Sequence, residues 1–281
     1  MNISAFIKQH SIITYFVLTF AISWGVVLFS VGGLDGLPGT VEQFEILLPY
    51  VVLAMLLGPS VSGILLTKML YGKEGIHKLF LRLLTWRVKI KWYIIAVFTA
   101  PILTVITLFL LSLTPGIFSA DNKILHFTLG VITGLAAGCF EELGWTGFAI
   151  PQLRQHYSIF VTGIIVGFLW GAWHFIVTLW GSSSTIGTLS LWLYLPGLLF
   201  SFLPPYRILM VWIYDRTQSL LIAMLMHASL TASVRIFDPL AISGMSLVAY
   251  NLVLGIAFWG VVAVISFKSK IFLQNRKLQE N

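Results

Sequence analysis

The chain has 281 residues, of which 58% are hydrophobic, 14% are aromatic and only 10% are charged. This composition is too apolar for a soluble domain, so the sequence predicts an integral membrane protein. The formal net charge is +7, but the basic residues lie in short loops and tails between apolar runs. That placement argues against nucleic-acid binding and for contact with anionic lipid. The single cysteine, Cys139, excludes a disulfide framework.

Apolar runs of the roughly 20 residues needed to cross a bilayer recur along the whole chain. The expected spans are 12–33, 46–70, 92–115, 124–148, 158–180, 189–213, 219–236 and 243–267. We therefore expect one membrane domain, residues 1–281, with an all-α polytopic fold of about eight transmembrane helices. The first span is too long for a signal-peptide core and is expected to be retained. Pro196, Pro204, Pro205 and Arg207 interrupt the sixth span, which we expect to be broken or partly interfacial.

Lys and Arg gather in alternate loops. One set of loops and tails carries Lys8, Lys73, Lys78, Arg82, Arg87, Lys89, Lys91, Arg154, Arg216, Lys268, Lys270, Arg276 and Lys277. The other set is acidic, mixed or uncharged, and its first loop holds Asp35, Glu42 and Glu45. The positive-inside rule therefore predicts that both termini are cytoplasmic. The short loops are typical of a protein of a prokaryotic cell membrane.

The longest basic loop, residues 73–90, has a periodicity of its own. Ile76, Leu79, Phe80 and Leu83 recur at helical spacing between basic residues. We expect an amphipathic helix that lies in the cytoplasmic interface and connects the second span to the third.

Four ionisable residues lie well inside the predicted spans. Glu141 and Glu142 are adjacent in the fourth span, His174 lies in the fifth, and His227 lies in the seventh. A charged side chain in the hydrocarbon costs at least about 2.5 kcal/mol, so such residues are functional by default. One of them alone is as readily a buried packing residue, but two Glu and two His together predict an intramembrane site.

Small residues indicate which helix faces these side chains share. The fourth span carries Gly130, Gly134 and Gly138, and the fifth carries Gly163, Gly167 and Gly171. Such stripes let helices pack closely. Because Glu141, Glu142 and His174 follow the stripes by three or four residues, we expect them to face a cavity between the fourth, fifth and seventh spans. At about 1.5 Å per residue, His174 lies nearer the far membrane surface than the others, so the fifth span has to shift or tilt.

These residue types favour hydrolysis by an activated water molecule. A buried carboxylate beside an imidazole can take a proton from water, and a second imidazole can stabilise the oxyanion of a tetrahedral intermediate. Glu141, Glu142, His174 and His227 are equally acceptable Zn²⁺ ligands, and a bound zinc ion would itself acidify the water. Neither HExxH nor GxSxG occurs in the sequence, so water is the expected nucleophile.

Three motifs in residues 124–235 resemble those of the CPBP intramembrane peptidases, which include CAAX prenyl endopeptidases of the Ras-converting-enzyme type. The family has Glu-Glu-x-x-x-Arg, aromatic-x-x-x-His and His-x-x-x-Asn; this chain has Glu141-Glu142 with Thr146, Trp170 with His174, and His227 with Thr231. The resemblance implies that Glu141 and His174 activate water, that Glu142 supports them or ligates, and that His227 stabilises the oxyanion. Thr146 and Thr231 would then act as oxyanion or supporting groups.

The two threonines depart from the family pattern, because they replace an Arg and an Asn. Thr146 leaves the second carboxylate without its usual cation, which Arg154 could supply if the chain turned back. The first hypothesis is an endopeptidase acting on a hydrophobic or lipidated peptide. The second is a non-catalytic bacteriocin-immunity or peptide-maturation protein of the same family. The third is a proton-coupled transporter, against which the sequence shows no paired inverted repeats. The substrate and the oligomeric state are not predicted.

Overall fold

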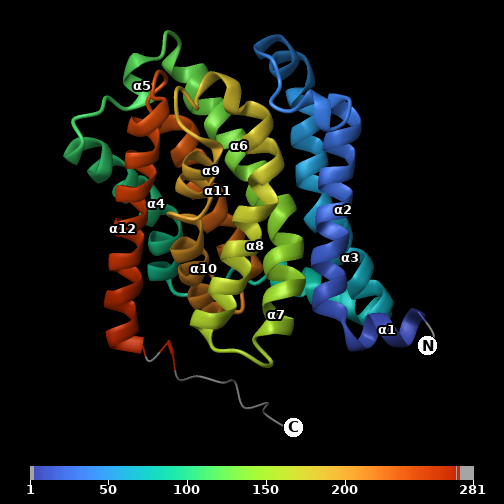
Figure 1. The fold of residues 1–281 in the computed structure, drawn as a ribbon. Coiled ribbons are helices and arrows are strands. Elements are labelled where there is room, and N and C mark those ends of the chain that lie inside the picture. The colour runs from blue at the N-terminus through green and yellow to red at the C-terminus, as the bar shows by residue number, and fades with distance from the viewer. Residues whose placement is uncertain (1–2, 270, 273–281) are drawn as a thin grey trace.

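The computed structural model describes residues 3–269, 271 and 272, and all regular structure in that part of the chain is helical (Figure 1). The elements are α1 (Ile3–Gln9), α2 (Ser11–Val31), η1 (Leu34–Gly36), α3 (Val41–Leu83), α4 (Ile90–Leu110), α5 (Gly116–Ser119), α6 (Lys123–Gly144), η2 (Trp145–Ala149), α7 (Ile150–Leu153), α8 (Ile159–Trp180), η3 (Gly181–Ser184), α9 (Leu191–Leu199), α10 (Leu203–Thr217), α11 (Leu220–Phe237) and α12 (Gly244–Ser269). Within these residues, eight segments are long and apolar enough to cross a membrane, which confirms the predicted all-α polytopic membrane fold.

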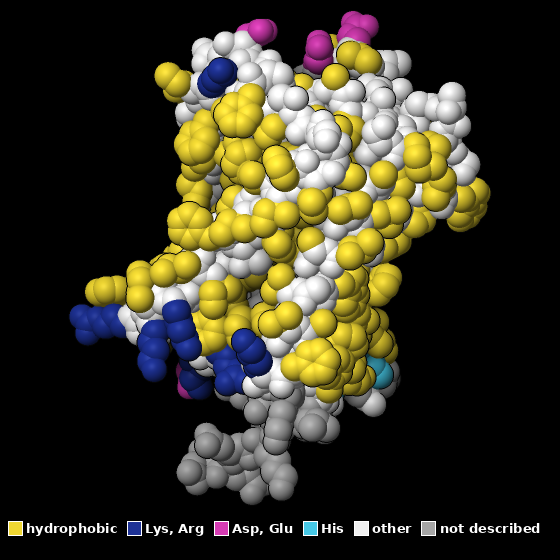
Figure 2. All heavy atoms as spheres, turned by 90° about the vertical axis from the view of Figure 1, so that its left-hand side faces the viewer, with side chains coloured by type: hydrophobic (Ala, Val, Ile, Leu, Met, Phe, Trp, Pro, Cys, Tyr) yellow, Lys and Arg dark blue, Asp and Glu magenta, His cyan; other side chains and the backbone are white. Residues whose placement is uncertain are grey.

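The two ends of the bundle differ in charge. Helix α1 and the last turn of α12 lie at the same end of the bundle, as an even number of spans requires (Figure 1). On the face drawn in Figure 2, most Lys and Arg side chains gather at that end, acidic side chains gather at the other end, and hydrophobic side chains cover the middle. Lys270, Arg276 and Lys277 lie outside the described residues. The cytoplasmic assignment of the basic end stays a prediction.

The helices that carry the predicted site each begin at a side-chain cap. Asn122, Ser158 and Ser219 precede α6, α8 and α11, and each side chain accepts a hydrogen bond from the backbone N–H three residues further on. Such caps satisfy donors that the first helical turn leaves free and fix where the helix starts. The starting residue in turn fixes how far along each helix the Glu and His side chains lie.

The basic loop forms a helix that continues α3 after a break. Gly72 has φ +61° and ψ −151°, a conformation that glycine adopts without steric cost, and it separates the membrane span from the helical turns up to Leu83. Leu79 on these turns is buried and packs against Leu220 and Met224. These contacts do not test whether the helix lies in the lipid interface, so that position stays a prediction.

The sixth span is broken, as predicted, and its second half lies at the centre of the bundle. Helices α9 and α10 are separated by Phe200–Phe202, and every residue from Leu203 to Tyr214 is buried. Contacts with α8, α11 and α12 surround α10. Pro204 and Pro205 fall in its first turn, where proline costs no hydrogen bond, so they start a helix there and do not push the segment to the interface.

The glycine stripes set the closest helix contacts. A Cβ atom on Gly138 of α6 would lie 2.3 Å from the carbonyl oxygen of Met224 in α11, and one on Gly163 of α8 would lie 2.6 Å from the Cα atom of Ile208 in α10. Only glycine permits such approaches between helix backbones. The stripe on α6 therefore brings the glutamate pair against α11, while the stripe on α8 packs against α10, the second half of the sixth span.

Candidate active site

Glu142 is the most enclosed of the predicted site residues. Its side chain is 0% exposed, and both carboxylate oxygens accept hydrogen bonds from Nη1 of Arg207, at 2.8 and 2.9 Å. Oε1 also accepts from Nδ1 of His227 at 2.6 Å, and Oε2 accepts from the hydroxyl of Thr146. A buried carboxylate with this many donors is held as the anion. Glu142 is therefore a fixed negative charge at the centre of the site.

Arg207 supplies the cation that the sequence lacks at position 146. The side chain comes from α10, is 0% exposed, and its guanidinium lies 4.1 Å from the ring centroid of Trp170. A planar guanidinium is well suited to pair with a carboxylate and stack on an aromatic ring. The prediction that Arg154 takes this role is wrong, because Arg154 forms an ion pair with Asp215 at 2.9 Å. Arg154 directly follows the short helix α7, and its partner Asp215 lies in the last turn of α10.

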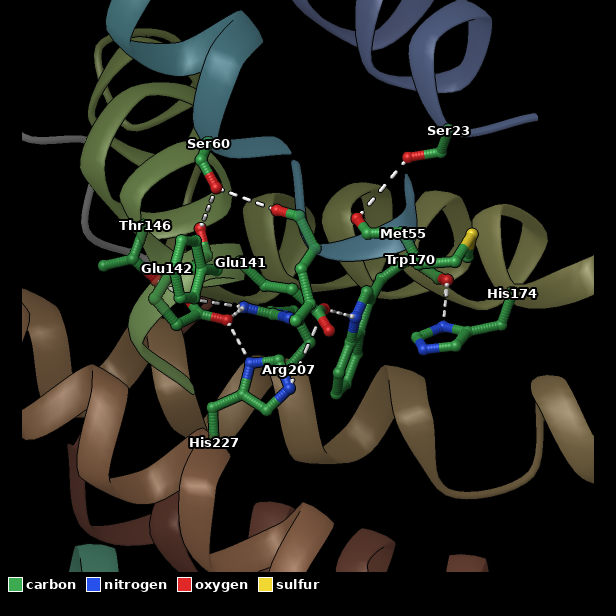
Figure 3. A network of polar contacts seen from close by, with 12 residues as sticks. Ser23, Met55, Ser60, Glu141, Glu142, Thr146, Trp170, His174, Arg207 and His227 are labelled. Atoms are coloured by element: carbon green, nitrogen blue, oxygen red, sulfur yellow. Dashed lines mark hydrogen bonds and ion pairs between the residues drawn. The ribbon is translucent and has the colours of Figure 1, made fainter. Parts of the chain in front are cut away.

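His227 lies between the two glutamates (Figure 3). Its Nδ1 is 2.6 Å from Glu142, and its Nε2 is 3.8 Å from Oε2 of Glu141. Because a carboxylate oxygen can only accept, Nδ1–H of His227 donates to Glu142, and Nε2 is left facing Glu141.

Glu141 differs from its neighbour in having few donors. Oε2 accepts a hydrogen bond from the indole Nε1–H of Trp170 at 3.0 Å, and Glu141 lines a cavity that Glu142 does not reach. The two adjacent carboxylates therefore have different environments. Glu142 is surrounded by hydrogen-bond donors, whereas Glu141 is open to a molecule in the cavity.

His174 lines the same cavity from α8. The structure therefore brings it to the site, although its position along the predicted span places it nearer the far membrane surface. Its Nδ1 lies 2.9 Å from the carbonyl oxygen of Trp170, one turn earlier. Within the described residues His174 has no hydrogen bond or ion pair with either glutamate. Donation from Nδ1 to that carbonyl leaves Nε2 as the lone-pair nitrogen of a neutral ring. His174 and Glu141 thus line one cavity from two different helices.

The two threonines that depart from the family motifs lie in different places. Thr146 is fully buried in a π-helical turn, η2 (Trp145–Ala149), and donates to Glu142, so it supports the carboxylate and does not line the cavity. Such turns are frequent at functional sites. Thr231 lies one turn beyond His227 on α11 and lines the cavity. Of the two, only Thr231 is placed where it could contact a bound substrate.

The cavity has a volume of about 440 Å³ and lies between more helices than the three predicted. Besides α6, α8 and α11, the broken sixth span contributes Leu198, Phe202 and Leu203, and α12 contributes Asn251. Most of the remaining lining is aliphatic or aromatic. Its walls thus combine a few polar groups with extensive apolar surface, as binding sites generally do.

Zinc is the alternative to a metal-free mechanism, and the arrangement does not fit it. Among residues 3–269, 271 and 272, no three His, Cys, Asp or Glu side chains converge as a metal site requires. Both oxygens of Glu142 face the guanidinium of Arg207, which would repel a cation, and Nδ1 of His227 is taken by Glu142. The four predicted ligands are therefore not arranged to bind one metal ion together.

Arg207 is the functional residue that sequence reasoning missed. The hydropathy pattern identifies it only as an interruption of the sixth span, alongside three prolines. The signal was nevertheless present, because Arg207 is an ionisable residue between apolar stretches. The argument that marked Glu141, Glu142 and the two histidines as functional applies to it equally.

Two comparisons with known proteins agree with the motifs. Residues 123–233 match a family described as type II CAAX prenyl endopeptidase Rce1-like. The chain is also similar to CAAX prenyl protease 2 of Methanococcus maripaludis, with 29% identity over 160 residues, which is 56% of this chain and 54% of that protein. The chain thus spans about half the length of the curated relative it matches. Together, the three motifs and these two matches support membership of the CPBP/CAAX protease family.

Proposed function

We propose that the protein is an intramembrane endopeptidase that hydrolyses a peptide bond with water activated by Glu141. The observation that carries this proposal is the unequal pair of carboxylates. Glu142 is saturated by Arg207, His227 and Thr146, whereas Glu141 has one indole donor and lines an apolar cavity. Two adjacent carboxyl groups with such different environments have different roles, one as a fixed charge and one as the proton acceptor.

The proposed reaction needs no covalent intermediate. A water molecule between Glu141 and His174 gives a proton to Glu141 and attacks the carbonyl carbon of the scissile bond. Nε2–H of His227 donates to the oxyanion that forms. Glu141 then returns the proton to the leaving nitrogen and the C–N bond breaks. The products are a carboxylic acid and an amine, and transfer of the acid proton to the amine gives a carboxylate and an ammonium group. Glu142 accepts from Nδ1–H of His227 and so orients the ring, and this step requires a second proton on Nε2.

The non-catalytic alternative is weakened by Arg207. That hypothesis depends on the absence of an arginine at position 146 and of an asparagine at position 231. Arg207 gives Glu142 a cation at 2.8 Å, so the first departure does not remove the charge balance of the site. Thr231 still offers a hydroxyl to the cavity that it lines.

The apolar lining favours a hydrophobic or lipidated peptide as substrate. The curated relative is called a prenyl protease, which makes a prenylated peptide one candidate to be compared with its unmodified form. We also propose that the basic end of the bundle faces the cytoplasm of a prokaryotic cell and contacts anionic lipid, since Lys and Arg gather at that end (Figure 2). Cysteine accessibility at the two ends of the bundle in intact cells would test the orientation.

Cleavage by the purified protein in liposomes is expected to persist in the presence of strong chelators. The substrate pool would be a library of hydrophobic peptides, half of them prenylated, with cleavage sites read by mass spectrometry and the metal content measured in the same preparation. Because Glu141 itself accepts the proton of the water molecule, removal of metal should change the rate by less than about twofold. Complete loss of activity that zinc restores would reject the metal-free mechanism, and a library that stays intact would reject the peptidase.

Trp170→Phe is expected to lower kcat about 10–100-fold with little change in KM. The variant retains the aromatic ring beneath Arg207 but removes the Nε1–H that holds Oε2 of Glu141 at 3.0 Å. A hydrogen bond to a charged group contributes about 1.5–3 kcal/mol, which corresponds to that range. Trp86→Phe, at an exposed position outside the site, is the matched control. Equal kinetics for the wild type and Trp170→Phe would show that the indole does not position the base.

A further inference from the structure

The cavity continues along α11, away from the proposed catalytic residues. His227, Thr231, Val234 and Asp238 all line it, at intervals of four, three and four residues, which places them on one face of the helix and the residue that follows it. Eleven residues at about 1.5 Å each give roughly 16 Å between the two ends. Helix α11 starts beside the basic loop of residues 73–90, where the hydroxyl of Ser219 donates to the carbonyl of Thr85. Asp238 therefore lies towards the opposite end of the bundle.

Asp238 has one side-chain hydrogen bond and no ion pair in the part of the chain that the structure describes. Its Oδ1 accepts a hydrogen bond from the hydroxyl of Tyr250 at 2.7 Å, and within the described residues no Lys, Arg or His nitrogen lies within 4.0 Å of it. Arg235, three residues earlier, is exposed, and His126 contacts the carbonyl oxygen of Ile236. Burial raises the pKa of Asp238 to about 7. A cation brought into the cavity would stabilise the ionised form.

Between the two ends the cavity is mainly apolar, with Thr231 as a polar side chain on α11. Its apolar lining includes Leu198, Phe202, Leu230, Val234 and Leu247. A ligand complementary to the residues along the whole cavity would have a reactive amide at one end, a hydrophobic middle and a positive charge at the other end. An uncompensated carboxylate at the edge of the membrane is costly, and a cationic ligand is the partner that would offset this cost.

We propose that Asp238 is a substrate-binding subsite for a cationic group, and that the substrate carries a lysine, an arginine or a free amino terminus separated from the scissile bond by a hydrophobic segment. This inference rests on the proposed peptidase function. An extended peptide advances about 3.3–3.6 Å per residue. The span of roughly 16 Å therefore places the cationic group about five residues from the bond that is cut.

The test uses hydrophobic peptides that contain a single lysine at varied positions, together with matched peptides in which norleucine replaces that lysine. The full-length protein in liposomes cleaves them, and mass spectrometry identifies the bonds. Bonds about five residues from the lysine are expected to be cut at least about tenfold faster than the same bonds in the norleucine peptides. Asp238→Asn should reduce this preference to less than about twofold, because asparagine can still accept from Tyr250 but carries no charge.

Tyr250→Phe separates a binding role from a packing role. This variant keeps the carboxylate and removes its hydrogen bond to α12, so it should retain the preference for lysine. Equal loss of the preference in Asp238→Asn and Tyr250→Phe would assign Asp238 to helix packing and overturn the subsite. Equal cleavage of the lysine and norleucine peptides by the wild type would also overturn it while leaving the peptidase in place. If no peptide of either kind is cut, the proposed peptidase function itself is wrong.

Discussion

Glu141→Gln is expected to lower the rate of peptide cleavage by about 10²–10⁴-fold, because the variant removes the group that accepts the proton of the attacking water. The amide oxygen of glutamine can still accept the hydrogen bond from Trp170, which is 3.0 Å from Oε2 in the wild type. The side chain keeps its size and its position on the cavity wall. The loss should therefore fall on kcat, and substrate binding should change little.

Glu74→Gln is a matched control for this experiment. Glu74 is an exposed acid that pairs with Lys78 at 2.7 Å in the basic loop of residues 73–90, away from the proposed catalytic residues. Both variants should reach the membrane and unfold within a few degrees of the wild type, since glutamine keeps the size of the glutamate side chain and can still accept a hydrogen bond. Cleavage by Glu141→Gln at the rate of the wild type, in protein shown to be free of contaminating peptidase, would remove Glu141 from the role of base.

Hydropathy predicted the fold well because the bilayer restricts what a chain can form. Each span must satisfy its own backbone hydrogen bonds over about 20 apolar residues, so span positions follow from composition alone. The stripe of Gly130, Gly134 and Gly138 added a second constraint, and α6 indeed packs closely on α11 along it. Glu141, Glu142 and His227 then meet because all three lie on the surfaces that these two helices share.

The remaining features depend on contacts that a sequence does not encode locally. Arg207 is 65 residues from Glu142, and the pair forms only because α10 passes through the middle of the bundle. The prolines before Arg207 indicated a break in the span but not where the second half lies. The depth of His174 likewise depends on how α8 packs against α10. Asp238 lies two residues past the predicted end of the seventh span, and it lines the cavity only because the cavity extends past the end of α11.

Arg207→Met is expected to destabilise the protein by about 3–5 kcal/mol and to abolish cleavage, because it leaves Glu142 as a buried charge without a cation. Glu142 has 0% exposure and cannot reach water in the folded state. Combining this change with Glu142→Gln removes the unpaired charge, so the double variant should unfold at a higher temperature than Arg207→Met alone. Thermal unfolding in detergent measures the first effect, and the double-mutant cycle measures the coupling between the two side chains.

Arg154→Met is the matched control, since Arg154 is a second buried arginine that pairs with an aspartate, Asp215, outside the site. Adding Glu142→Gln to Arg154→Met should not recover the stability that Arg154→Met loses. An equal effect of Glu142→Gln on both arginine variants would mean that the recovery is not specific to the Arg207–Glu142 pair.

Thr146→Arg tests whether Arg207 replaces the arginine that family members carry in the first motif. Thr146 already contacts Glu142 one helical turn away, and Arg207→Met vacates the space that the guanidinium occupies. The Arg207→Met/Thr146→Arg variant should therefore regain cleavage at least about tenfold above Arg207→Met, since it returns a cation to the same carboxylate. Arg207→Met/Thr146→Leu has a side chain of intermediate size without charge and should stay inactive. Recovery in both double variants would assign the defect to packing, and recovery in neither would mean that the cation must come from α10.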